Sequence, residues 1–113
     1  MNNRNNSSLI THSTSPFTEV NEIILTLSAF KEKNKEKYNI EKLGLFGSYT
    51  RNSYSKESDI DIIVKTKRAD LFLLVHMKEE LEELLKMKVD LVRYRKRMNT
   101  FLKQHIDEEA IYV

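Results

Sequence analysis

Two aspartates on one predicted strand are the residues whose types and spacing point most directly to chemistry. Asp59 and Asp61 alternate with isoleucines within residues 58–64. Residues two apart in a β-strand lie on the same face, so the two carboxylates share one face and the isoleucines can pack on the other. Two like charges held this close repel each other unless a cation lies between them. Because carboxylates and substrate phosphates are the usual ligands of Mg²⁺, the pattern predicts a metal–nucleotide site.

A glycine and a serine follow a short apolar run upstream of this strand. Leu45 and Phe46 come directly before Gly47 and Ser48. Glycine lets the backbone approach a ligand closely, and we expect a short helix to begin at Ser48. The free N–H groups of a helix start, together with the Ser48 hydroxyl, could hold a phosphate. The alternative interpretation of the pair alone is an ordinary turn with a serine cap.

Hydrophobic spacing predicts the helices and strands that must hold these residues. A first helix is expected from Pro16 to about Tyr38, since proline suits the first helical position. The later elements are predicted in this order: a strand over residues 43–46, a short helix from Ser48, a strand over 59–65, a helix over 70–86, a strand over 88–93 and a helix over 98–108. This order predicts an α/β (α+β) fold, with a small mixed sheet of at least three strands and flanking helices.

Length and composition limit the class of protein. The chain has 113 residues, enough for one domain, which we predict over residues 16–113 after a polar disordered tail over residues 1–15. The absence of cysteine excludes disulfides and thiolate metal sites. The formal net charge of +2 demands no nucleic-acid partner, and no apolar run approaches the roughly 20 residues of a membrane span. We therefore expect a cytoplasmic protein that neither enters a membrane nor binds nucleic acid directly.

The spacing of the polar residues resembles that of a known family. Ten residues separate Ser48 from Asp59, one separates Asp59 from Asp61, and Asp90 lies on a later predicted strand. This order resembles the nucleotidyltransferase superfamily related to DNA polymerase beta. More narrowly, the chain resembles the minimal nucleotidyltransferase (MNT) domain, the partner of HEPN-domain toxins in prokaryotic toxin–antitoxin pairs. The resemblance runs from about Ile23 to the C-terminus and includes residues 45–48, Arg51, 58–61, 88–92 and 109–113.

The resemblance implies a metal-binding role for each of the three acids. Asp59 and Asp61 would hold two Mg²⁺ ions. Asp90 would be the third carboxylate, binding the metal that activates the attacking hydroxyl or serving as its base. In such a two-metal site, the ions stabilise the entering and leaving oxygens of an in-line displacement. Here the displacement would occur at the nucleotide α-phosphate, with pyrophosphate leaving.

The resemblance also implies roles for the glycine–serine turn. Gly47 and Ser48 would cradle the triphosphate of ATP. Arg51 matches an arginine of the family and could reach the phosphates, because its guanidinium fork suits them; a structural salt bridge is the equal alternative. Asn52 stands where the family commonly has glycine. Asparagine tolerates positive φ better than other residues with a side chain, so we expect the turn to survive.

The function implied by the resemblance is that of an antitoxin enzyme. It would transfer AMP from ATP to a hydroxyl, expected to be a tyrosine, of a cognate HEPN ribonuclease toxin and so neutralise it. The chain and toxin would then form a hetero-oligomer. Two alternatives stay open: a non-catalytic antitoxin that inhibits the toxin by binding, and a nucleotidyltransferase that modifies a small molecule or an RNA end.

A basic run and three tyrosines near the predicted site have no single interpretation. Residues 93–97 could contact the triphosphate, a partner, or only solvent. Tyr49, Tyr54 and Tyr94 lie near the predicted site in sequence. One of them could stack on the nucleotide base, but their spacing does not select which.

Overall fold

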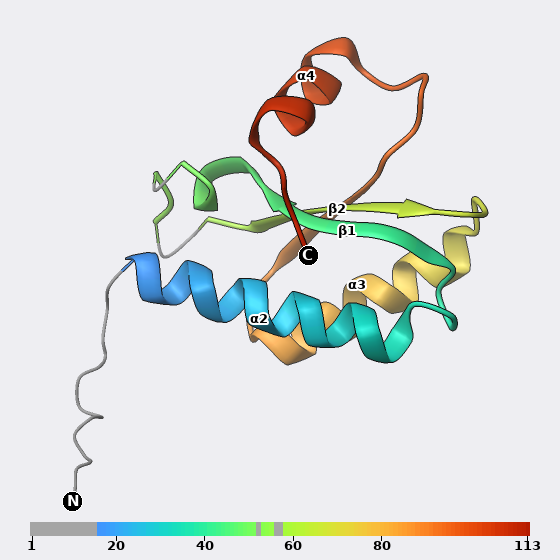
Figure 1. Ribbon diagram of the computed structural model, residues 1–113, viewed down its shortest axis with the longest axis horizontal. Coiled ribbons are helices and arrows are strands. Elements are labelled where there is room, and N and C mark those ends of the chain that lie inside the picture. The colour runs from blue at the N-terminus through green and yellow to red at the C-terminus, as the bar shows by residue number, and fades with distance from the viewer. Residues whose placement is uncertain (1–15, 52, 56–57) are drawn as a thin grey trace, which may run out of the picture.

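A four-stranded mixed sheet with helices on both faces forms the fold (Figure 1). The computed structural model describes residues 16–51, 53–55 and 58–113. The predicted tail over residues 1–15 and the substitution of the family's glycine by Asn52 lie outside the described residues. The predicted fold class, with at least three strands and flanking helices, is confirmed.

The sheet combines parallel and antiparallel pairing. Its strands are β1 (Ile40–Phe46), β2 (Ile60–Thr66), β3 (Val89–Arg93) and β4 (Ile111–Tyr112), in the spatial order β3-β2-β1-β4. β2 runs parallel to β3 and antiparallel to β1, while β4 pairs antiparallel with β1. β4 was not predicted, because a two-residue strand is too short to show alternation. Glycine at position 44 makes room for it, since a Cβ there would lie only 2.8 Å from the Ile111 carbonyl oxygen.

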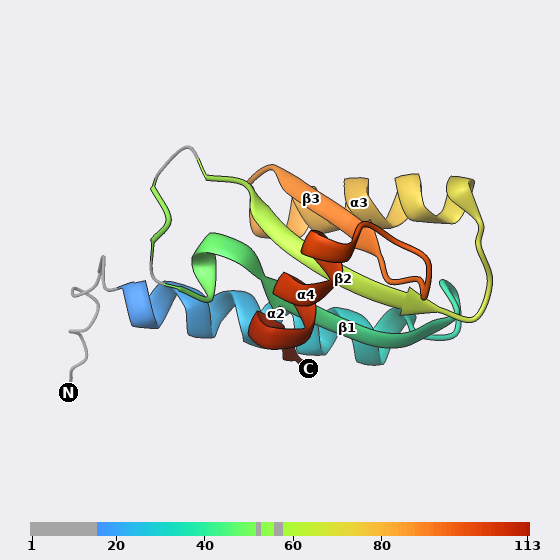
Figure 2. The ribbon, with the colours of Figure 1, turned by 90° about the horizontal axis from the view of Figure 1, so that it is seen from above.

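The helices are divided between the two faces of the sheet. Helices α2 (Pro16–Asn34) and α3 (Leu71–Leu85) lie on one face, and α4 (Thr100–Glu109) lies on the other (Figures 1 and 2). The predicted bounds of the last two helices agree with these to within two residues. Asp70 caps α3 by accepting hydrogen bonds from the backbone of the first turn, and Asn99 caps α4 in the same way.

The first helix ends earlier than predicted, at Asn34 instead of about Tyr38. The buried Tyr38 still packs against the helix, where its ring stacks on Phe30 with 5.9 Å between centroids. It reaches this position from a turn, however. Asn39 adopts a left-handed φ of 56°, which asparagine tolerates, and this turn directs the chain into β1.

Two apolar clusters fill the two faces of the sheet. The larger lies under α2 and α3 and contains Ile60, Ile62 and Val64 of β2. The smaller lies under α4 and contains Ile63 together with Ile106. The predicted alternation is therefore confirmed: the isoleucines at 60 and 62 enter the larger core, and the intervening Asp61 belongs to the α4 side of the sheet. Within the described part of the chain, no helix is long and apolar enough to span a membrane.

Candidate active site

Three aspartates lie close together along β2 and β3. In the parallel pairing of these strands, Asp61 is the register partner of Asp90. Asp59 directly precedes β2, two residues before Asp61. Asp59 and Asp90 are exposed, whereas Asp61 is partly buried. The fold thus brings together acids that come from segments about 30 residues apart in sequence.

Burial and like charges both act on the Asp61 carboxylate, and burial has the larger effect. Burial, together with the smaller effects of the charges of Asp90 and Asp59, raises the pKa of Asp61 to about 6. The nearby charge of Arg51 opposes this rise in pKa. A bound cation would relieve the repulsion within such a group of like charges, and the metal site itself stays a prediction.

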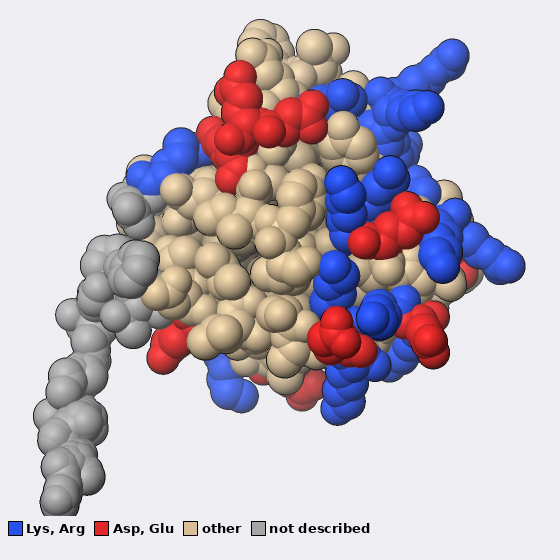
Figure 3. Space-filling view, in the orientation of Figure 1, with Lys and Arg blue, Asp and Glu red and all other residues tan. Residues whose placement is uncertain are grey.

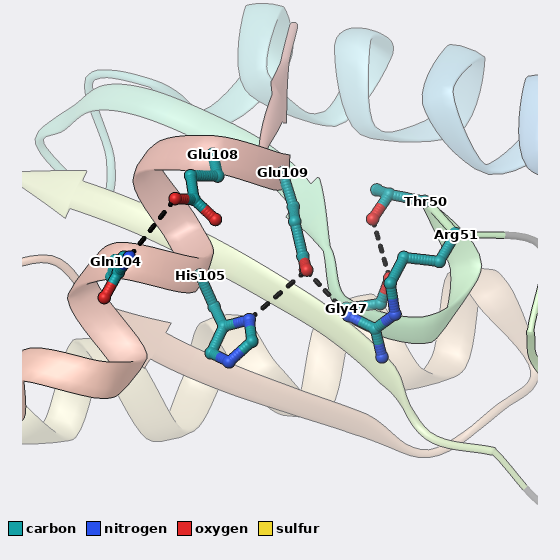
Figure 4. Close-up of polar contacts among 7 residues, drawn as sticks. All are labelled: Gly47, Thr50, Arg51, Gln104, His105, Glu108 and Glu109. Atoms are coloured by element: carbon teal, nitrogen blue, oxygen red, sulfur yellow. Dashed lines mark hydrogen bonds and ion pairs between the residues drawn. The ribbon is translucent and has the colours of Figure 1, made fainter.

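Gly47 brings the turn after β1 directly against the acids. It has a φ of +83°, and a Cβ built on it would collide with the carboxylate of Asp61. Only glycine therefore fits here, for two separate reasons: the backbone is left-handed and the space is filled. The backbone N–H and the Oγ1 of Thr50 donate to the Gly47 carbonyl oxygen at 3.0 and 2.6 Å and fix the turn (Figure 4).

The short helix predicted from Ser48 is smaller than expected. It is a single 3-10 turn, η3 (Gly47–Tyr49), which begins one residue earlier. Three residues do not build a helix dipole, so that part of the phosphate-binding prediction has no support. The partly exposed Ser48 nevertheless stands beside Gly47 at the acidic group, and its carbonyl oxygen accepts hydrogen bonds from the backbone N–H groups of Arg51 and Ser53 at 3.2 and 3.0 Å.

Arg51 lies within reach of both an ion-pair partner and the acids. Its Nη1 is 2.8 Å from Oε1 of Glu109 on α4 (Figure 4). Its charge also lowers the pKa of Asp61. The structural salt bridge that the sequence left open is therefore present, at a position from which the guanidinium still acts on the acidic group. Sequence reasoning did not select Glu109, which it treated only as part of a family-like C-terminal segment.

A comparison with protein-family models shows the family of the chain. The family model described as "Polymerase beta, Nucleotidyltransferase" matches residues 28–113. The chain belongs to this family. As a member it is a nucleotidyltransferase, and the acids, the Gly47 turn and Arg51 all lie inside the matched segment.

Several relatives of this nucleotidyltransferase carry names that concern protein adenylylation. The protein adenylyltransferase MntA of Thermococcus cleftensis is 32% identical over 93 residues, which are 81% of this chain and 93% of the relative. A solved mutant of the toxin–antitoxin MntA-HpeT has a TM-score of 0.63 at 26% identity, covering 82% of this chain and 70% of that one. The tri-AMPylated Shewanella oneidensis HEPN toxin in complex with MNT antitoxin gives a TM-score of 0.55 at 25% identity, covering 87% of this chain and 71% of that one.

The oxygen donors of the three aspartates are of the kind that Mg²⁺ prefers, although their side chains do not converge on one point. Carboxylates are the hard oxygen ligands that this ion prefers. Among the described residues, no three acidic, histidine or cysteine side chains converge on one point as they stand. Because Asp59, Asp61 and Asp90 repel one another in the ion-free chain, we expect their side chains to turn inward when a cation binds.

The tyrosines and the basic run divide between core and surface. Tyr49 is buried, and its ring stacks on Tyr54 with 4.1 Å between centroids, so Tyr49 is not free to stack on a base. The hydroxyl of Tyr94 donates to Asp107 on α4 at 3.2 Å. Arg95, Lys96 and Arg97 are exposed on the connector between β3 and α4.

Proposed function

We propose that this nucleotidyltransferase transfers AMP from ATP to a hydroxyl of a HEPN ribonuclease toxin, and that the transfer neutralises the toxin. The observation that carries the proposal is the parallel register that sets Asp61 beside Asp90, next to a turn in which only glycine fits. The names of the relatives support a protein as the acceptor and AMP as the group transferred. Under this proposal the chain is the antitoxin of a cytoplasmic pair and assembles with its toxin as a hetero-oligomer.

The chain's own acids would divide the work of the reaction. Asp59, Asp61 and Asp90 would hold two Mg²⁺ ions, which neutralise charge on the triphosphate when bound. Asp90, exposed on β3, is placed to orient the attacking hydroxyl or to take its proton. The acceptor oxygen forms a bond to the α-phosphorus while the bond from that phosphorus to the β-phosphate oxygen breaks. Pyrophosphate carries away the electron pair of the broken bond.

The turn after β1 would bind the rest of the nucleotide. Gly47 lets the turn pack directly against the Asp61 carboxylate, so the triphosphate would contact the turn and the acids together. The Ser48 hydroxyl would donate to a phosphate oxygen. Arg51 would add charge-assisted hydrogen bonds at the outer phosphates. We assign the acceptor hydroxyl to a tyrosine of the toxin, as the family resemblance implies.

A transfer experiment with position-specific labels tests this proposal. The chain is incubated with Mg²⁺, its genomic neighbour's product and ATP labelled at either the α- or the γ-phosphate. We expect α-label but no γ-label on the partner protein, and no label with an Asp59→Asn/Asp61→Asn variant. Asp107→Asn is the matched control, because Asp107 is an exposed aspartate on α4, and it should transfer normally. Transfer of γ-label, or transfer of α-label only to RNA or a small molecule, would contradict the proposal.

Inhibition by binding alone is the second candidate, and exposed apolar side chains favour it. Leu25 on α2 is 69% exposed and Phe101 on α4 is 77% exposed. Figure 3 also shows a broad area without charged side chains on the face that it draws. Such surfaces are typical of protein docking sites. If the Asp59→Asn/Asp61→Asn variant binds and silences the partner as well as the unchanged chain does, this second function is the correct one.

A further inference from the structure

The carboxylate of Glu109 is held between two side chains at the edge of the acidic group. Its Oε1 is 2.8 Å from Nη1 of Arg51, and its Oε2 is 3.3 Å from Nδ1 of His105 (Figure 4). The Glu109 side chain is only 18% exposed, compared with 48% for that of Arg51. Burial pushes the pKa of Glu109 upward, but its bonds to His105 and Arg51 outweigh this and hold the pKa below the usual value. Glu109 is therefore a charged anchor.

The backbone around Glu109 is fixed by both the helix and the sheet. Glu109 is the last residue of α4, and the N–H of the next residue, Ala110, donates to the Ile106 carbonyl oxygen at 2.9 Å. Ile106 is fully buried in the smaller apolar cluster. Directly after Ala110, Ile111 pairs with Leu45 of β1, the strand that leads into the Gly47 turn. The anchor is thus tied to the same strand that positions the site.

Among the described residues, the side chain of Arg51 is bonded only to Glu109. Arg51 follows η3, and its backbone N–H donates to the Ser48 carbonyl oxygen at 3.2 Å, but about half of its side chain faces solvent. A long side chain at such a position would lose much rotamer freedom on binding a ligand. The pair with Glu109 removes part of that freedom beforehand, while the guanidinium remains close enough to lower the pKa of Asp61.

We propose that Glu109 is a positioning residue that holds the Arg51 guanidinium at the rim of the acidic group, ready for the nucleotide triphosphate. The inference rests on the proposed nucleotidyl transfer. A guanidinium has five N–H donors, and the contact with Glu109 engages Nη1, so donors remain for phosphate oxygens. Because the benefit lies in preorganisation, Glu109 should strengthen nucleotide binding more than it accelerates the chemical step.

A conservative substitution separates this role from a purely structural one. Glu109→Gln keeps the shape of the side chain and removes its charge. We expect the Kd for a non-hydrolysable ATP analogue with Mg²⁺, and the KM for ATP, to rise about tenfold with kcat much less affected. Glu108→Gln is the matched control, because Glu108 is an exposed neighbour whose Oε2 accepts a hydrogen bond from Gln104 at 3.3 Å (Figure 4). It should leave both constants unchanged.

The same substitution in an Arg51→Gln background provides the decisive comparison. If Glu109 acts through Arg51, Glu109→Gln should not weaken nucleotide binding further once Arg51 is gone. An equal loss in both backgrounds, or no loss in either, would overturn the inference. If the unchanged chain binds none of the four nucleoside triphosphates with Mg²⁺, the proposed function itself fails, and the Glu109 role fails with it.

Discussion

At residue scale, the missing side chain of Gly47 is what allows Asp61 to lie against the turn. The left-handed φ of +83° disfavours any residue with a Cβ, and the Asp61 carboxylate fills the space where that Cβ would stand. The Gly47 turn and the Asp61 carboxylate thus form a single packed unit. A substitution at either residue should therefore displace the other.

Replacing this glycine therefore should damage stability and activity together. We expect Gly47→Ala to lower the free energy of unfolding by about 1–3 kcal/mol, since it adds both backbone strain and a steric collision. Nucleotidyl transfer should be lost because Asp61 is displaced. Urea unfolding, with Ser48→Ala as the stability control, measures the first effect. An alanine variant with unchanged stability and full transfer would show that the turn is not packed against Asp61 in solution.

The raised pKa of Asp61 gives a second prediction at this scale. The folded chain raises that pKa from 3.8 to about 6, so the ionised form destabilises the ion-free fold above about pH 6. This penalty comes first from burial and then from the charges of Asp90 and Asp59, which solvent partly screens. We expect Asp61→Asn to be more stable by about 1 kcal/mol at pH 8 without metal. The difference should shrink as the pH falls from about 6 towards 4.

Denaturant unfolding of the unchanged chain and of Asp61→Asn, in chelator and in Mg²⁺, measures this difference in stability. Mg²⁺ should stabilise the unchanged chain and reverse the order of the two proteins, while Asp61→Asn should gain little. If Asp61→Asn is the less stable protein at pH 8 in chelator, the carboxylates do not repel one another as described.

At element scale, Glu82 ties the end of α3 to the start of β3. Its Oε2 accepts a hydrogen bond from the Val89 backbone N–H at 3.0 Å. That bond is the main cause that lowers the pKa of Glu82 below its usual value, with the nearby Lys78 adding to it. β3 carries Asp90, so this contact helps to fix the register that sets Asp90 beside Asp61.

Removing this carboxylate should loosen the start of β3. We expect Glu82→Ala to lower Tm by about 4 °C at pH 7, because the Val89 N–H loses its acceptor. For an acid whose pKa is lowered by folding, the stabilisation is present above the unfolded value of 4.5 and disappears as the pH falls through the folded pKa. Calorimetry between pH 7 and pH 3 tests this. Equal losses for Glu82→Ala and for Glu83→Ala, its exposed neighbour on α3, would contradict it.

The strands and helix α4 show which parts of the site could be predicted from the sequence and which could not. Period-two alternation was enough to place Asp61 opposite the isoleucines, because burial of one face fixes the phase of a strand. Asp59, predicted to begin this strand, lies one residue before it. The register of Asp61 with Asp90 depends on which strands become neighbours, which a single strand pattern does not contain. The partnership of Arg51 and Glu109 spans 58 positions, and only the tertiary packing of α4 creates it.

At the scale of the whole molecule, the larger apolar core and the acidic residues lie on opposite faces of the sheet. The larger cluster and the helices α2 and α3 fill one face, and α4 covers part of the other (Figure 2). Asp61 and its register partner Asp90 belong to the α4 face. α4 buries only a small cluster, yet it carries Glu109. Under the proposed function, the exposed apolar side chains would be where a partner protein docks. The function of this chain should therefore be visible only when the partner is present.

The most direct test asks whether the partner stays modified after this chain has been removed. The partner is incubated with the chain, Mg²⁺ and ATP, separated from the chain under denaturing conditions, refolded and assayed for ribonuclease activity. After incubation with ATP, we predict that the partner stays inactive and carries AMP. After incubation without ATP, or with the Asp59→Asn/Asp61→Asn variant, the partner should regain its ribonuclease activity. Full recovery of activity after incubation with ATP would contradict the account, because inhibition would then depend on occupancy alone.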